Sequence, residues 1–207
     1  MKQTETANTR HVVIKDLNRR GMFYESADYH GFLRYLCASV HRHASRLHAY
    51  ALLPDHVHLL LSASRHVHLV KMLEQSREAY AGYFNFTHRR IWKKLEPDCA
   101  VLLPVADYRL LVYYRYIELA PVRQGLVNDP GDYPWTSYGC NAMGEDTGIL
   151  SPHEAYLGLG VDEPARRRLV STLVTGAGAG IGRGPSSTRT RSGGSPSASC
   201  TMRGRNA

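Results

Sequence analysis

The sequence predicts an α/β protein with one sheet and helices packed on it. Two apolar runs are joined by a short Pro54-Asp55 turn, which is typical of a β-hairpin. Segments with helical spacing of apolar residues stand before and after this hairpin. The chain has 207 residues, of which 43% are hydrophobic and 21% charged, which suits one compact domain with short extensions.

Four short apolar runs are expected to be strands. The first covers residues 11–15, and the hairpin supplies residues 47–53 and 56–62. Residues 99–104 are the fourth. The run at 56–62 is apolar on both faces, which is typical of a central strand covered on both sides.

Three segments are expected to be helices, at about 27–44, 67–86 and 107–120. Pro121 either ends or kinks the last of them, because proline has no backbone N–H to donate. The resulting order is β-α-β-β-α-β-α. It predicts a ferredoxin-like sandwich with a mainly antiparallel four-stranded sheet.

The composition changes along the chain and suggests four regions. Residues 1–9 are expected to be a flexible N-terminus, 10–143 the main domain and 144–175 a small helical appendix. Residues 176–207 are dominated by Gly, Ser, Thr, Pro and Arg and are expected to be disordered.

The net charge of +8 comes mainly from the tail, which holds five arginines, no lysine and no acidic residue. Without the tail, 21 basic residues face 18 acidic ones, a net charge of +3. Charge alone is therefore weak evidence that the main domain binds nucleic acid.

Membrane insertion and export are not expected. No apolar run is long enough for a membrane helix, and the first residues form no apolar signal region. The four cysteines are far apart and form no C-x-x-C pair, which argues against a zinc ribbon and fits a reducing cytoplasm.

Three pairs of histidines are separated by one residue: His41/His43, His56/His58 and His66/His68. The first pair falls in a predicted helix, where residues two apart point in nearly opposite directions. The last pair falls at a loop-to-helix junction. Only the middle pair falls in a strand, where such residues project from the same face. Two interpretations stay open for it: imidazoles hydrogen-bonded in the core, or ligands of a divalent metal.

Tyrosines crowd the third predicted helix, at positions 108, 113, 114 and 116. Aromatic residues at helical spacing more often belong to a core than to a catalytic site, because they bury so much area. Helical spacing alone therefore identifies no nucleophile.

The chain resembles the single-tyrosine HUH transposases, and within them the branch associated with repetitive extragenic palindromes. Residues 53–60 (LPDHVHLL) look like the histidine–hydrophobic–histidine strand of that family. Residues 115–127 (RYIELAPVRQGLV) look like its tyrosine helix, usually RYIELNPVRAGLV. Residues 132–138 (DYPWTSY) match the segment that follows, and residues 151–160 resemble a terminal extension of some members.

The resemblance implies the ferredoxin-like fold and an enzyme that cleaves and rejoins single-stranded DNA, often at a hairpin. Carried onto this chain, Tyr116 is the nucleophile and forms a 5′-phosphotyrosine link. His56 and His58 hold Mg²⁺ or Mn²⁺ beside the scissile phosphate. Relatives act as monomers or as homodimers.

The chain departs from the family pattern at two places. The asparagine four residues after the tyrosine is Ala120 here, and the resemblance makes that asparagine the third protein ligand of the metal. Alanine has no donor atom, so weaker metal binding and weaker cleavage are expected, and Ala120→Asn should raise nicking. Many members also carry a G-x-L-W-x-x-R-[YF] run where residues 90–96 read RIWKKLE, which keeps Trp92 alone.

Two further functions compete with DNA strand transfer. One is a non-catalytic module that binds single-stranded or hairpin DNA, as a decayed or repurposed transposase. The other is a structural domain with histidines in its core. Basic side chains that could contact phosphates, or equally form a solvated basic face, are Arg19, Arg20, Arg89, Arg90, Lys93, Lys94 and Arg123.

Overall fold

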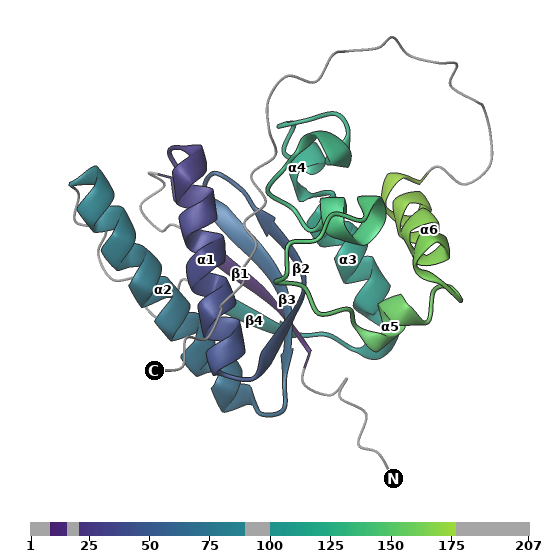
Figure 1. Cartoon of the computed structure of the whole chain (residues 1–207), viewed down its shortest axis with the longest axis horizontal. Helices are drawn as coiled ribbons and strands as arrows, with labels where there is room; N and C mark the ends of the chain where they lie inside the picture. The colour runs from purple at the N-terminus through teal and green to yellow at the C-terminus, as the bar shows by residue number, and fades with distance from the viewer. Residues whose placement is uncertain (1–8, 16–20, 90–99, 177–207) are drawn as a thin grey trace, which may run out of the picture.

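A four-stranded sheet forms the centre of the protein, with helices on both of its faces (Figure 1). The computed structural model describes residues 9–15, 21–89 and 100–176. All strand pairs are antiparallel, and the order across the sheet is β2-β3-β1-β4. The strands are β1 (Arg10–Lys15), β2 (Ser45–Leu52), β3 (His56–Ala63) and β4 (Ala100–Pro104). The predicted ferredoxin-like arrangement is confirmed.

Helices α1 (Ser26–Arg42) and α2 (His66–His88) lie side by side on one face, and α3 (Leu110–Glu118) lies on the other (Figure 1). The remaining short elements follow α3 along the chain. They are α4 (Ala120–Arg123), α5 (Glu154–Leu157), α6 (Glu163–Thr175), the 3-10 turns Asp107–Arg109 and Pro130–Asp132, and the π-helical turn Gly139–Met143. Among the described residues, no helix is both long enough and apolar enough to cross a membrane.

Pro121 divides the predicted third helix. The α-helix α3 ends at Glu118, and the four-residue α4 starts again at Ala120 with Pro121 in its first turn. Proline is tolerated there because the N–H groups of a first turn have no partner within the helix. The division matters for the site because Gln124, directly after α4, reaches His56 of β3.

Alternation along the strands separates two hydrophobic cores. Val57, Leu59 and Leu61 of β3 pack with α1 and α2, whereas Leu60 packs with α3. His56 and His58 share the side of Leu60, because residues two apart in a strand project from the same face. The predicted central strand is confirmed, since β3 lies between β2 and β1 and is buried from Val57 to Ala63.

The segment after α4 covers the outer edge of β2. The backbone N–H of Leu52 donates to Trp135 O at 2.9 Å, and Ser137 N donates to Tyr50 O at 2.9 Å. The Trp135 ring also stacks on Tyr29 of α1 at 4.5 Å. An open edge strand invites pairing with other chains, and this segment blocks it. The chain then returns as α5 and α6, which add Tyr156, Val170 and Val174 to the core around α3.

A buried carboxyl group connects α3 to this segment. Glu118 is fully buried, and its Oε1 accepts hydrogen bonds from Ser137 Oγ at 2.9 Å and Asn141 Nδ2 at 2.7 Å. The two motifs RYIEL and DYPWTSY therefore meet in the interior. Burial raises the pKa of Glu118 to about 7, although both hydrogen bonds oppose the shift.

Replacing Glu118 by glutamine should flatten the pH dependence of stability. The folded pKa is about 7 against 4.5 for the ordinary carboxyl, so the proton favours the folded state. The stability that this proton contributes is complete below pH 4.5 and is lost as pH rises through 7, on the order of 3 kcal/mol. Urea unfolding at pH 5 and pH 8 should show that Glu118→Gln lacks this loss. Parallel curves for the variant and the wild type would contradict the assignment.

Candidate active site

His56 and His58 project side by side from the face of β3 that α3 covers. Their Nε2 atoms are 3.2 Å apart, and the two rings meet nearly edge to face, with centroids 4.8 Å apart. His58 is buried, and His56 is partly exposed. Both side chains therefore direct the same nitrogen to one point.

The other ring nitrogen of each histidine has its own partner. Nδ1 of His56 donates to the carboxylate of Asp55 at 2.7 Å, and Nδ1 of His58 lies 3.1 Å from Nε2 of His11. His11 comes from the neighbouring strand β1, and its ring stacks on that of His58 with centroids 5.2 Å apart. The result is a row of three imidazoles that runs from Asp55 into the interior.

Both buried histidines of this row are uncharged at neutral pH. Burial lowers the pKa of His58 to about 3, and the neighbouring His56 adds to the effect. Burial also lowers the pKa of His11 to about 4, with a smaller contribution from Arg123. Neutral imidazole is the form that binds metal ions.

The row accommodates both interpretations that the sequence left open. If His11 donates to His58 and His58 to His56, the imidazoles form a chain of hydrogen bonds without a metal. If His58 donates to His11 instead, the Nε2 lone pairs of His56 and His58 face each other and repel unless a cation lies between them. Two nitrogens bound at about 2.1 Å to one ion stand about 3.0–3.4 Å apart, so the observed 3.2 Å fits a divalent metal.

Tyr116 lies against the same row. Its ring meets His58 edge to face at 5.6 Å between centroids and His11 at 5.8 Å. The Tyr116 side chain is 45% exposed, whereas Tyr114 in the same helix is 1% exposed. Tyr113 also touches His11, at 5.1 Å, and is mostly covered. Tyr116 combines contact with His58 and access from solvent.

Arg123 covers the other side of the Tyr116 ring. Its guanidinium carbon lies 3.9 Å from the ring centre, and Nη1 donates to the backbone carbonyl of Tyr116. A guanidinium stacked on a phenol ring still presents free N–H groups that match phosphate oxygens. Of the seven cationic residues predicted to contact DNA, Arg123 is the one that the described part of the chain brings to Tyr116.

The other predicted cations are elsewhere. Arg89 is exposed at the end of α2, in the left-handed conformation with φ 48°, on the face of the sheet opposite α3. The remaining five predicted cations lie outside the described residues: Arg19, Arg20, Arg90, Lys93 and Lys94. Trp92, residues 1–8 and the tail from residue 177 lie outside them as well.

Two residues near the histidines were not predicted from the sequence. His11 reaches His58 because β1 pairs with β3 in a register that sets Val13 opposite His58. Gln124, which follows α4, places its side-chain nitrogen 3.4 Å from Nε2 of His56. A usable signal existed for Gln124, because the quoted family motif has alanine there. Ala120 itself is buried in the core around α3.

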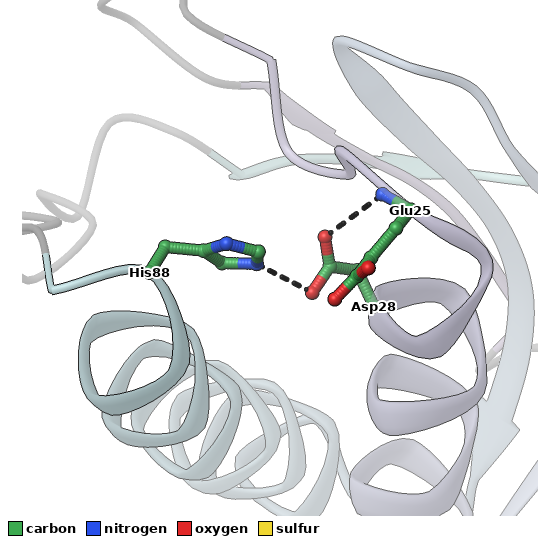
Figure 2. Close-up of side chains that lie close together, drawn as sticks. All are labelled: Glu25, Asp28 and His88. Carbon is green, nitrogen blue, oxygen red and sulfur yellow. Dashed lines mark hydrogen bonds and ion pairs between the residues drawn. The ribbon is translucent and has the colours of Figure 1, made fainter.

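A second group of titratable side chains lies on the opposite face of the sheet. Figure 2 shows Glu25 and Asp28 at the start of α1 facing His88 at the end of α2. Asp28 is completely buried, and its oxygens already accept from Tyr24 N at 2.8 Å, Glu25 N at 3.2 Å and His88 Nε2 at 2.8 Å. This network caps α1 and holds the two helices together.

Asp28→Ala should destabilise the protein by about 3 kcal/mol. The substitution leaves the backbone N–H groups of Tyr24 and Glu25, just before α1, and the His88 ring without their acceptor. Thermal unfolding should show a melting temperature lower by roughly 6–12 °C. Glu74→Ala, an exposed acidic position on α2, is the control and should change stability by less than about 0.5 kcal/mol. Equal melting temperatures for the two variants would contradict the capping role.

Comparison with known proteins agrees with the resemblance. The family model described as "Transposase IS200 like" matches residues 5–97, which include His56 and His58 but end before Tyr116. One solved structure, "Structure of the REP associates tyrosine transposase bound to a REP hairpin", matches with a TM-score of 0.50. The two chains are 16% identical, and the match covers 73% of this chain and 87% of the other. No curated protein matches.

The family match and the shared fold point to the same group of proteins. The histidine strand lies within the family match, and the sheet with its flanking helices is the fold of the solved transposase. The chain is therefore similar to the IS200-like transposase family over residues 5–97, and its fold agrees with that match.

Proposed function

We propose that this protein is a DNA strand transferase that breaks and rejoins single-stranded DNA next to a hairpin, with Tyr116 as nucleophile. The observation that carries the proposal is the position of Tyr116. It is the solvent-accessible tyrosine whose ring touches His58 and whose other side faces Arg123. The similar solved transposase is bound to a hairpin, which suggests the class of substrate.

The chemistry follows from these neighbours. The Tyr116 hydroxyl loses its proton and attacks the scissile phosphorus, and the bond from phosphorus to the 3′-oxygen breaks. The 3′-oxygen gains a proton, and the phosphate stays joined to Tyr116 as a 5′-phosphotyrosine. Because one ester replaces another, a 3′-hydroxyl can later attack the phosphotyrosine and rejoin the strand.

His56 and His58 would hold Mg²⁺ or Mn²⁺ through their paired Nε2 atoms. A cation there would draw charge from the phosphate oxygens and stabilise the charge that develops during attack. Asp55 and His11 fix the rings through the Nδ1 atoms and thereby keep both Nε2 atoms directed at one point. Arg123 offers its free N–H groups to the same phosphate.

The test is a search for the covalent intermediate. The full chain is incubated with Mn²⁺ and a labelled hairpin that carries a single-stranded flank, then denatured and separated by electrophoresis. A labelled band at the mass of protein plus cleaved strand is expected, and peptide mapping should locate the label on the peptide that contains Tyr116. Failure to detect an adduct with hairpins of varied flank sequence would reject strand transfer.

One observation favours a second candidate, a non-catalytic protein that binds hairpin or single-stranded DNA. Position 120 holds a methyl group where the family pattern has an asparagine. The same assay separates the two candidates, because retarded mobility in a native gel without any covalent band is the result expected of a binding module.

A further inference from the structure

We propose that Gln124 supplies a third, oxygen ligand to the metal at His56 and His58. The inference rests on the proposed function, since it concerns the same site. Its starting point is that three side chains converge on one place. Nε2 of His56 lies 3.2 Å from Nε2 of His58 and 3.4 Å from the carboxamide nitrogen of Gln124.

Both distances fit neighbouring ligands of one ion, which stand about 3.0–3.4 Å apart when each bond is about 2.1 Å long. A carboxamide offers oxygen on one side and nitrogen on the other, with nearly the same shape. A half-turn of the Gln124 amide exchanges the two atoms and places its oxygen beside the histidine nitrogens. Amide oxygen is a hard, neutral donor of the kind that Mg²⁺ and Mn²⁺ accept.

The helix geometry explains why Gln124 can reach this place. Its backbone N–H donates to Ala120 O at 3.1 Å, so the two residues are one turn apart on the same side of α4. Side chains of a helix tilt towards its N-terminus, and the long Gln124 side chain therefore extends over position 120.

Among the described histidine, cysteine and acidic side chains, none joins His56 and His58 to complete a group of three ligands. Within the described residues, the group of such side chains close enough to share one ion consists of Glu25, Asp28 and His88. This group lies on the other face of the sheet. Asp55 and His11 are engaged with the Nδ1 atoms. The amide of Gln124 lies beside His56 and can extend the pair of histidines.

The exchange of residue types agrees with this geometry. The tyrosine-helix motif has asparagine at the position of Ala120 and alanine at that of Gln124, whereas this chain has alanine first and glutamine second. The amide donor has moved by one helical turn. The weak two-histidine site expected from Ala120 alone becomes a site of three protein ligands.

In the experiment, Mn²⁺ is titrated into the full chain without DNA. Its affinity is measured by calorimetry and by the electron paramagnetic resonance signal of the Mn²⁺ that remains free. Gln124→Ala should weaken binding about tenfold or more, and adding Ala120→Asn to that variant should restore most of the affinity. Gln124→Glu should bind at least as tightly as wild type, because a carboxylate is a ligand but cannot donate a hydrogen bond to His56. Gln75→Ala is the matched control. Gln75 also pairs with a histidine, through its Oε1 at 2.7 Å from Nε2 of His43, and its substitution should leave Mn²⁺ affinity unchanged.

The outcomes separate this inference from the proposed function. If His58→Ala loses Mn²⁺ binding while Gln124→Ala keeps wild-type affinity, the third ligand is wrong and the histidine site stands. If His58→Ala binds Mn²⁺ as wild type does, the metal site itself is wrong and the inference falls with it. Melting temperatures measured for each variant ensure that lost binding is not lost folding.

Discussion

Tyr116→Phe should abolish the covalent adduct with DNA while leaving the fold intact. The substitution removes one oxygen atom from a side chain that is 45% exposed, so the loss of packing is small. The ring still meets His58 and Arg123, whose contacts are with the ring face and edge. Without the hydroxyl no phosphotyrosine ester can form, and the labelled band on a denaturing gel should fall below detection.

Tyr108→Phe is the matched control. Tyr108 stands in the 3-10 turn before α3, is 79% exposed and lies outside the histidine row. The Tyr108→Phe variant should form the adduct as the wild type does. An adduct that persists in Tyr116→Phe but disappears in Tyr108→Phe would show that the nucleophile has been assigned to the wrong tyrosine.

His58→Ala should reduce formation of the Mn²⁺-dependent adduct by at least about 100-fold. His58 is the centre of the row: it faces His56 at 3.2 Å, His11 at 3.1 Å and the ring of Tyr116. Its removal takes away one nitrogen of the proposed metal site and the support of the phenol ring together. The rate of adduct formation at saturating Mn²⁺ measures the effect.

His66→Ala provides the comparison, because His66 is an exposed histidine of another H-x-H pair and should retain full activity. DNA binding in a native gel and the melting temperature distinguish a lost active site from a lost fold. If His58→Ala still binds DNA, remains folded and forms the adduct at the wild-type rate, the row is a structural core and the metal interpretation fails.

Local patterns in the sequence were sufficient to predict the helices and strands and to assign the side chains of the central strand to its two faces. Alternation placed His56 and His58 on one face before any contact was known, and helical spacing located α1 and α2 to within two residues at each end. Both signals are local, since they depend on the period of a strand or helix. Proline at 121 left two outcomes open, and the structure shows the helix interrupted and resumed.

Residues joined by long-range packing could not be found in the same way. The contacts of His11 with His58 and of Asp28 with His88 connect positions 47 and 60 residues apart. They depend on strand register and on how two helices dock, which no local period encodes. The same is true of Glu118, which the structure shows to be the buried link to Ser137 and Asn141.

The sequence by itself determined the α/β fold, the strand that carries His56 and His58, and the resemblance that singled out Tyr116. Only the tertiary structure decided which side chains stand around them. It brought His11 and Gln124 to the two histidines, and it placed Arg123 on the ring of Tyr116. The physical reason is that a periodic pattern specifies the direction of a side chain within its own element, whereas its neighbours depend on how separate elements pack.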